Sequence, residues 1–238
     1  MADDRTPLFE VRDVIKDYHG LRPLRLKSLT VEQGESVALV GFDLAMAEVL
    51  VNMLTAATLP DSGEVRAFGQ STRAIGDGDT WLASLDRYGI ITGRAVLLDA
   101  MTVEQNLAIP ISLDLHALGT PVLDRVRALA DEVGLTAAEL ATPVATATPR
   151  TRLRLHLGRA LAPDPLVLLA EHPNALVEPD DALAFARDYA RVVAARRIGS
   201  VVITADRAFA AACGARALTL APATGELRAD SMWRRLFG

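Results

Sequence analysis

The sequence predicts an α/β fold in which helices cover a parallel sheet. Three short runs are continuously aliphatic or β-branched, as in strands buried on both faces: residues 35–40 (ESVALV), 165–170 (PLVLLA) and 200–204 (SVVIT). Segments with the apolar spacing of helices separate these runs along the chain. This alternation predicts a parallel sheet with helical crossovers.

The first part of the chain predicts a small antiparallel unit followed by a buried strand and a helix. Residues 8–14 and 26–31 alternate between apolar and polar side chains and end near turn-forming residues, which favours two short antiparallel strands. The buried run at 35–40 ends at Gly41, and residues 44–54 then have helical spacing.

Later elements follow from turn residues and apolar periodicity. Gly134 closes a helix expected at 123–133, within a mainly helical section at 103–140. The other expectations are a turn and short strand at 60–69, a flexible loop at 76–78, a strand at 88–92, and helices at 151–161 and 182–197. No repeat or low-complexity linker divides the chain, so residues 1–238 form one domain.

Composition excludes several classes of protein. The 238 residues are 50% hydrophobic, enough for a substantial core, and carry a net charge of −5, which argues against nucleic acid as a direct partner. Cys213 is the single cysteine of the sequence, which rules out an internal disulfide. Its simplest interpretation is a small hydrophobic residue. The acidic N-terminus lacks the features of a secretory signal, and no apolar run reaches the roughly 20 residues of a membrane span, so we expect a cytoplasmic location.

The chain resembles the ATP-binding domains of ABC transporters across residues 8–228, because several phrases occur in the order of that family. The phrases are LFEVRDVIKDYHG, VEQGESVALVG, LPDSGEVRAFG, DAMTVEQNLAIPI, LGRALAPDPLVLLAEHPNAL and SVVITADRAFAAACGARALTL. The phrase TVEQNLAIP is most similar to exporters of lipids or lipoproteins.

The resemblance implies a RecA-like parallel core with an antiparallel β lobe and an inserted helical lobe. The core and β lobe are expected at 1–92 and 155–238, and the helical lobe at 93–154. It also implies a transmembrane permease subunit, a paralogous ABC ATPase, or both as partners, with a homodimer as an alternative. The chain would then lie at the inner face of a membrane through its partner, which in this family docks at about 93–107.

The phosphate loop departs from the family pattern G-x-x-x-x-G-K-[ST]. Only Gly41 matches: Met46 replaces the second glycine, Ala47 the lysine, and Glu48 the magnesium-binding hydroxyl. Asp43 and Glu48 also place negative charge beside the phosphate position. Two like unit charges about 4 Å apart repel each other by roughly 4 kcal/mol at an effective dielectric of about 20. The simpler interpretation makes Asp43 a helix N-cap and Met46 a packing residue.

The signature and the strand that carries the catalytic carboxylates are altered as well. The family signature LSGGQ corresponds here to residues 147–151 (ATPRT), in which no glycine remains. Thr148 lies within this altered signature, and Pro149 can begin a helix. Glu171 and His172 stand where the family has an Asp-Glu pair. Glu171 could serve a metal and His172 a proton, but a hydrogen-bonded structural histidine is the simpler interpretation.

Four more positions correspond to residues that contact nucleotide or magnesium in the family or lie near them. Gly93 replaces the magnesium-sensing glutamine, Glu178 the dimer-loop aspartate, and Ala205 the switch histidine. Tyr18 matches the aromatic residue that stacks on adenine, although packing explains a lone tyrosine equally well.

The leading hypothesis is therefore a non-catalytic scaffold or regulator of a membrane transporter, with no catalytic residues and no bound cofactor expected. The alternative is a weakly active ATP-binding subunit that couples hydrolysis of magnesium-ATP to transport through Glu171 and His172. A third hypothesis is a cation site formed by Asp43, Glu48 and Glu171. The terminal segment 231–238 (SMWRRLFG) could contact a membrane surface or a partner.

Overall fold

The computed structural model describes residues 6–115 and 117–229, and its centre is a mixed six-stranded sheet. The strand order is β10-β9-β3-β8-β7-β6, and the pairs β9-β3, β3-β8, β8-β7 and β7-β6 are parallel, whereas β10 is antiparallel to β9. The strands are β3 (Ser36–Val40), β6 (Tyr88–Ile91), β7 (Val167–Glu171), β8 (Gly199–Ile203), β9 (Arg216–Ala221) and β10 (Glu226–Ala229).

The second sheet is antiparallel, as predicted, and has the order β2-β1-β4-β5. Phe9 in its central strand pairs with Val31 on one side and with Ala67 on the other. The strands are β1 (Phe9–Lys16), β2 (Leu24–Val31), β4 (Ser62–Ala67) and β5 (Gln70–Ser71).

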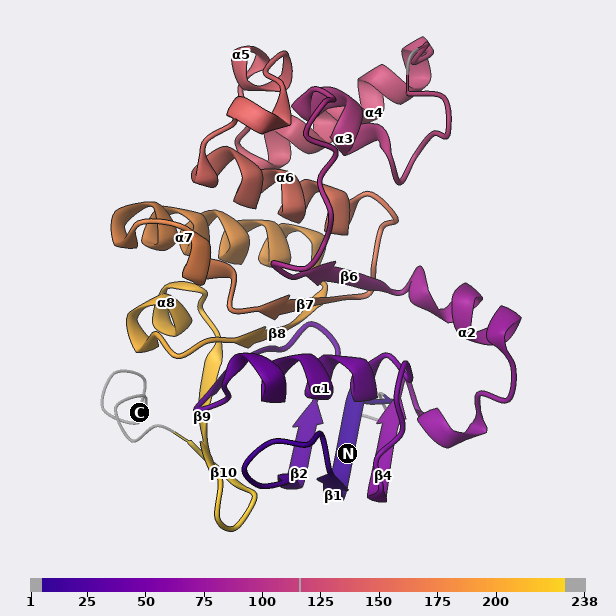
Figure 1. Cartoon of the computed structure of the whole chain (residues 1–238), viewed down its shortest axis with the longest axis vertical. Coiled ribbons are helices and arrows are strands. Elements are labelled where there is room, and N and C mark those ends of the chain that lie inside the picture. Colours follow the sequence, from indigo (N-terminus) through magenta and orange to yellow (C-terminus); the bar gives the residue numbers. More distant parts are fainter. Residues whose placement is uncertain (1–5, 116, 230–238) are drawn as a thin grey trace.

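Helices cover both faces of the six-stranded sheet (Figure 1). Helix α1 lies between the two sheets, while α6 and α7 cover the opposite face and α3 to α5 lie beyond α6. The α-helices are α1 (Leu44–Leu54), α2 (Gly78–Leu85), α3 (Val103–Ala108), α4 (Thr120–Val133), α5 (Ala137–Leu140), α6 (Pro149–Leu161), α7 (Pro179–Arg196) and α8 (Arg207–Ala212). The described residues also form the short 3-10 helices η1 (Thr72–Ala74), η2 (Val144–Thr146) and η3 (Pro173–Leu176).

The central strands are buried on both faces, which confirms the prediction from their continuous apolar runs. Ala38 and Val202 belong to the apolar cluster on the side of α6 and α7, whereas Val37, Leu39 and Val201 belong to the cluster on the side of α1 and the β lobe. Successive side chains of a strand point to opposite faces, so each strand must be apolar at every position to fill both clusters.

Local signals predicted the C-terminal ends of α1, α4, α6 and α7 to within one residue, whereas α4 and α7 each begin three residues before the predicted start. Gly134 ends α4 in the left-handed conformation at φ 74°, as expected for a glycine C-cap. Two helices were missed. Helix α2 follows the loop predicted at 76–78 and has no buried residue to create an apolar period, and α8 is only six residues long.

The predicted boundary between core and helical lobe at 154/155 falls within α6. That helix contacts α3 and α4 on one side and β6 on the other, and one apolar cluster is continuous across all of them. Within the described residues, no helix has both the length and the hydropathy required to cross a bilayer. Residues 231–238 lie outside the part of the chain that is described.

Candidate functional site

The loop that joins β3 to α1 is held by backbone geometry and a side-chain cap. Gly41 ends β3 at φ 91°, a conformation that favours glycine, and Asp43 begins α1 by accepting a hydrogen bond from the Met46 amide at 2.8 Å. The predicted N-cap is thereby confirmed. Met46 packs at the edge of the apolar cluster around β1 and α1, as the packing interpretation expected.

The position of the family lysine belongs to the core. Ala47 has an exposed fraction of 0%, and its cluster includes Leu50 and Leu54 of the same helix. Glu48, one residue further, is half-buried and faces the end of β7, where it meets a cation that the sequence analysis had not singled out.

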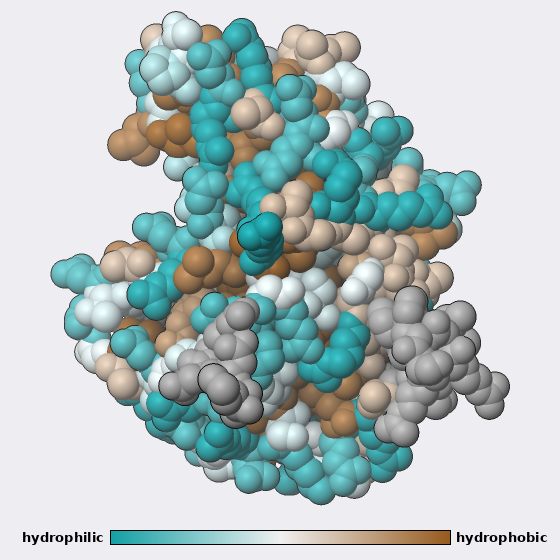
Figure 2. Space-filling model, turned by 180° about the vertical axis from the view of Figure 1, so that it is seen from behind, coloured by the Kyte–Doolittle hydropathy of each residue, from teal (hydrophilic) through white to brown (hydrophobic). Residues whose placement is uncertain are grey.

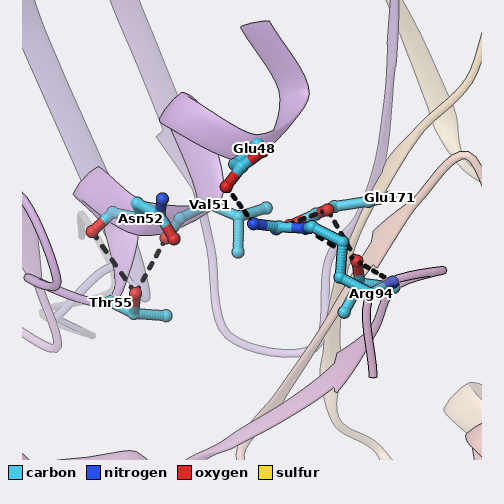
Figure 3. A network of polar contacts seen from close by, with 7 residues as sticks. Glu48, Val51, Asn52, Thr55, Arg94 and Glu171 are labelled. Atoms are coloured by element: carbon cyan, nitrogen blue, oxygen red, sulfur yellow. Dashed lines mark hydrogen bonds and ion pairs between the residues drawn. The ribbon is translucent and has the colours of Figure 1, made fainter. Parts of the chain in front are cut away.

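That cation is Arg94, and it joins Glu48 of α1 to Glu171 at the end of β7 (Figure 3). The Arg94 Nη2 atom lies 2.7 Å from Oε1 and 2.8 Å from Oε2 of Glu171, and Nη1 forms an ion pair with Oε1 of Glu48. Thr92 donates a further hydrogen bond of 2.9 Å to Glu171 Oε2. Both oxygens of the buried Glu171 carboxylate are therefore satisfied by the protein itself.

A weak sequence signal for Arg94 did exist. It is the only Lys or Arg between residues 88 and 124 of the sequence, and it directly follows a strand end and Gly93. Its two partners lie 46 and 77 positions away along the chain, so spacing alone does not reveal the cluster.

The charges of this cluster do not suit a triphosphate. The cluster of Glu48, Glu171 and Arg94 has a net charge of one negative unit, and both carboxylates already form ion pairs with Arg94. A phosphate group placed here would meet two carboxylates and no free lysine. The residues present at the loop and at the end of β7 therefore do not fit magnesium-ATP.

The residues considered for a metal site are also occupied otherwise. Asp43 caps α1, and Arg94 lies against both Glu48 and Glu171. The described residues contain no group of three or more His, Cys, Asp or Glu side chains that could hold a metal ion. The cation site of Asp43, Glu48 and Glu171 therefore stays a prediction, and in the folded chain each of these carboxylates has a partner within the protein.

His172 has strained backbone geometry. Its φ of 43° and ψ of 49° lie in the left-handed region, and its amide donates to the Ile203 carbonyl at 2.7 Å. The ring Nε2 is buried and finds no hydrogen-bond partner among the described residues. The expected hydrogen-bonded histidine is thus bonded through its backbone, while Nε2 of the ring is not.

The signature position forms an ordinary helix start. Thr148 caps α6 by accepting from the Thr151 amide at 3.1 Å, and Pro149 occupies the first turn, as predicted. The Thr151 hydroxyl donates to Glu139 at 2.8 Å. Arg150, in the first turn of this helix, is exposed.

The remaining family positions contribute little polar chemistry. Ala205 is exposed beyond β8, and Glu178 begins α7 without a side-chain hydrogen bond. Gly93 lies in the turn that places Arg94. Tyr18 packs against the cluster around β1, and its pKa is raised by burial and next by the Asp43 carboxylate, so it stands beside the loop of residues 41–48.

A cavity of about 490 Å³ opens beside the Arg94 cluster. Its walls come from α1, the segment after β6, α6 and η3, and most of them are apolar. Burial, with the nearby Arg159 and Arg152, lowers the pKa of the lining His156 to about 4, so this ring is neutral at pH 7. The lining residues are Leu44, Ala45, Glu48, Ile91, Thr92, Gly93, Arg94, Leu153, His156, Glu171, His172, Pro173 and Ala175.

The two sheets, the helix between them and the glycine turn after β3 define the ATP-binding-cassette ATPase fold. The dimeric ATP-binding cassette MJ0796 bound to ADP and Pi has a TM-score of 0.73 at 19% identity, covering 92% of this chain and 96% of that one. The cbiO1 protein of Clostridium perfringens, part of the ABC transporter complex cbiONQ, has a TM-score of 0.77 at 15% identity, covering 94% of this chain and 88% of that one.

Curated relatives point in the same direction. The methionine import ATP-binding protein MetN of Mesorhizobium japonicum is 34% identical over 157 residues, which are 64% of this chain and 41% of that protein. The phosphonates import ATP-binding protein PhnC of Anaeromyxobacter dehalogenans is 30% identical over 236 residues, which are 93% of this chain and 47% of that protein. The chain thus spans less than half of either relative.

No protein-family model matches the chain. The fold and the sequence similarity together support the ABC transporter ATP-binding domain family as its class. Both relatives are named for import, so they do not support the exporter-like resemblance of the TVEQNLAIP phrase.

Proposed function

We propose that this chain is a non-catalytic, ABC ATPase-like scaffold or regulator of a membrane transporter, with no catalytic residues and no nucleotide cofactor. One observation carries the proposal: Arg94 pairs with Glu48 and Glu171 where a working member of the family needs free positive charge and magnesium ligands. The buried Ala47 and the absence of glycine in residues 147–151 support it.

Both halves of the composite ATP site are altered in the sequence. In this family each ATP lies between the phosphate loop of one subunit and the signature of the other. In a homodimer of this chain, neither ATP site would be intact. In a heterodimer with a competent paralogue, each of the two sites would still contain one altered half, contributed by this chain. The chain would therefore act through binding to its partners.

The segment at 93–107, where the family docks its permease, is held in one arrangement. Asn106 accepts from the Leu98 amide at 2.8 Å and donates to the Leu98 carbonyl at 3.0 Å, and Arg159 donates to the Val96 carbonyl at 2.7 Å. Val96 itself is 72% exposed. Leu98 is a second exposed apolar residue of this segment. On the face opposite to that of Figure 1, Figure 2 shows further apolar side chains at the narrow middle of the molecule. A segment that is already held in one arrangement can bind a partner at a low entropic cost.

We propose a permease subunit, a paralogous ATPase or both as partners, which would hold the chain at the cytoplasmic face of a membrane. Co-purification of the full chain with its neighbouring gene products tests this part. Recovery of a membrane subunit or an ATPase is the expected result, and recovery of neither contradicts it.

The second candidate is an ATP-binding subunit of an ABC transporter that retains weak hydrolysis. The names of the relatives favour it, since MetN and PhnC are both ATP-binding proteins. Equilibrium binding of labelled ATP with magnesium decides between the two functions. We expect no saturable binding at micromolar ATP; micromolar affinity or measurable turnover would establish the second candidate instead.

A further inference from the structure

We propose that the cavity beside Arg94 binds a small organic monocation, with an apolar body against its walls and an ammonium group at Glu48. The cavity includes positions where the family holds phosphate and magnesium, among them Glu48, Gly93 and Glu171. The inference goes beyond the proposed function because it assigns this place a ligand of another chemical class. Four features of the cavity carry the inference.

The first feature is size and shape. A volume of about 490 Å³ lies within the range of ligand pockets, roughly 300 to 1,000 Å³, and the walls converge from four separate elements. Leu44, Ile91 and Leu153 supply apolar surface from α1, β6 and α6 respectively. Such walls favour an apolar body over a hydrated polyanion.

The second feature is the sign of the charge. Arg94 balances one of the two carboxylates, so the lining retains one negative charge. The arginines near His156 do not line the cavity: Arg152 pairs with Asp99 at 2.9 Å, and Arg159 donates to the Val96 carbonyl. A monocation is the charge that makes the cavity neutral.

The third feature is the availability of Glu48. Thr92 and both contacts of Arg94 Nη2 satisfy the two oxygens of Glu171, whereas the ion pair of Glu48 with Arg94 is made through Oε1. The side chain of Glu48 is 43% exposed, so its second oxygen can accept from an ammonium group without breaking the existing ion pair.

The fourth feature is the ring of His172: this residue lines the cavity, and its Nε2 is buried without a hydrogen-bond partner in the described part of the chain. A buried polar atom without a partner is uncommon and costs free energy. A small shift of this ring on ligand binding would give Nε2 a donor.

The test uses three probes of matched size on the full chain: 2-phenylethylamine, 2-phenylethanol and 3-phenylpropanoate, titrated by calorimetry at pH 7. We expect saturable binding of the amine, binding of the alcohol that is weaker by about fivefold, and still weaker binding of the acid. Equal affinities, or no saturable binding of the amine, would overturn the proposal.

Variants locate the site. Glu48→Gln is expected to reduce amine affinity by about fivefold, to the level of the alcohol. Glu32→Gln, which removes an exposed carboxylate in the turn between β2 and β3, is the matched control and should change nothing. Equal effects of the two substitutions would contradict the assignment.

Blocking variants separate this cavity from other surfaces. Ala45→Phe fills it from α1, and Ala175→Leu fills it from η3. Each should abolish binding of the amine and the alcohol while circular dichroism confirms the native fold. Undiminished binding in a folded blocking variant would place the ligand elsewhere and overturn the proposal.

Discussion

Nη2 of Arg94 lies 2.7 Å from Oε1 and 2.8 Å from Oε2 of Glu171, although 77 positions separate the two residues in the chain. Glu171 is 7% exposed, so it depends on this contact and on Thr92 for solvation. A carboxylate buried at the end of a core strand would be unfavourable without such a partner.

Arg94→Gln is therefore expected to destabilise the fold by about 2 kcal/mol, less than a fully buried pair would lose, because the Arg94 side chain is 47% exposed. Urea unfolding followed by circular dichroism measures the loss. Arg127→Gln removes an exposed pair with Asp124 and should cost under about 1 kcal/mol. Equal losses from the two variants would show that burial of Glu171 is unimportant.

Asp43→Ala should destabilise the chain by about 1 kcal/mol, because the side chain caps α1 at the Met46 amide. Asp43→Asn retains an acceptor at the same position and should restore most of the stability. Thermal unfolding of the two variants measures the difference. If asparagine is as destabilising as alanine, the charge of Asp43 matters and the cap does not.

Acid should destabilise the fold through His156. Its pKa of about 4 in the folded chain lies below the usual 6.5, so the unfolded chain binds a proton more readily between these values. Stability from this group is full above pH 6.5 and falls as the pH drops towards 4, by about 2 kcal/mol between pH 7 and pH 5. Urea unfolding at both pH values should show a smaller loss for His156→Gln; an equal loss in both proteins would assign the effect to other groups.

Restoring the phosphate loop should create nucleotide binding without hydrolysis. The variant Met46→Gly, Ala47→Lys, Glu48→Thr regains the family pattern after Gly41 and removes one carboxylate from the site. Labelled ATP with magnesium should bind this variant more tightly than the unmodified chain by at least about tenfold, since about 1.4 kcal/mol of restored attraction is sufficient.

Hydrolysis should stay absent from that variant, because the signature position still lacks glycine and Glu171 remains paired with Arg94. Ala47→Lys alone, with Glu48 retained, serves as the control and should bind ATP more weakly. A folded triple variant that gains no affinity would show that features outside the loop prevent binding.

Much of the architecture could be predicted because its signals are local. Each core strand contributes side chains to both apolar clusters and therefore appears as an uninterrupted apolar run, as at 35–40 and 200–204. Gly134 and Pro149 mark helix ends through their own backbone preferences. Helix α2 was missed because it buries no residue, so no apolar period marks it.

Amino-acid order alone predicted the buried strands β3, β7 and β8 and the long helices between them, and it aligned Ala47 with the lysine of the family. Only the folded chain brings Arg94 to Glu48 and Glu171 and leaves a cavity beside them. The physical reason is that periodicity and turn preferences act over a few residues, whereas ion pairs form between side chains that the sheet brings together. The tertiary structure therefore decides which charged side chains of this protein neutralise one another.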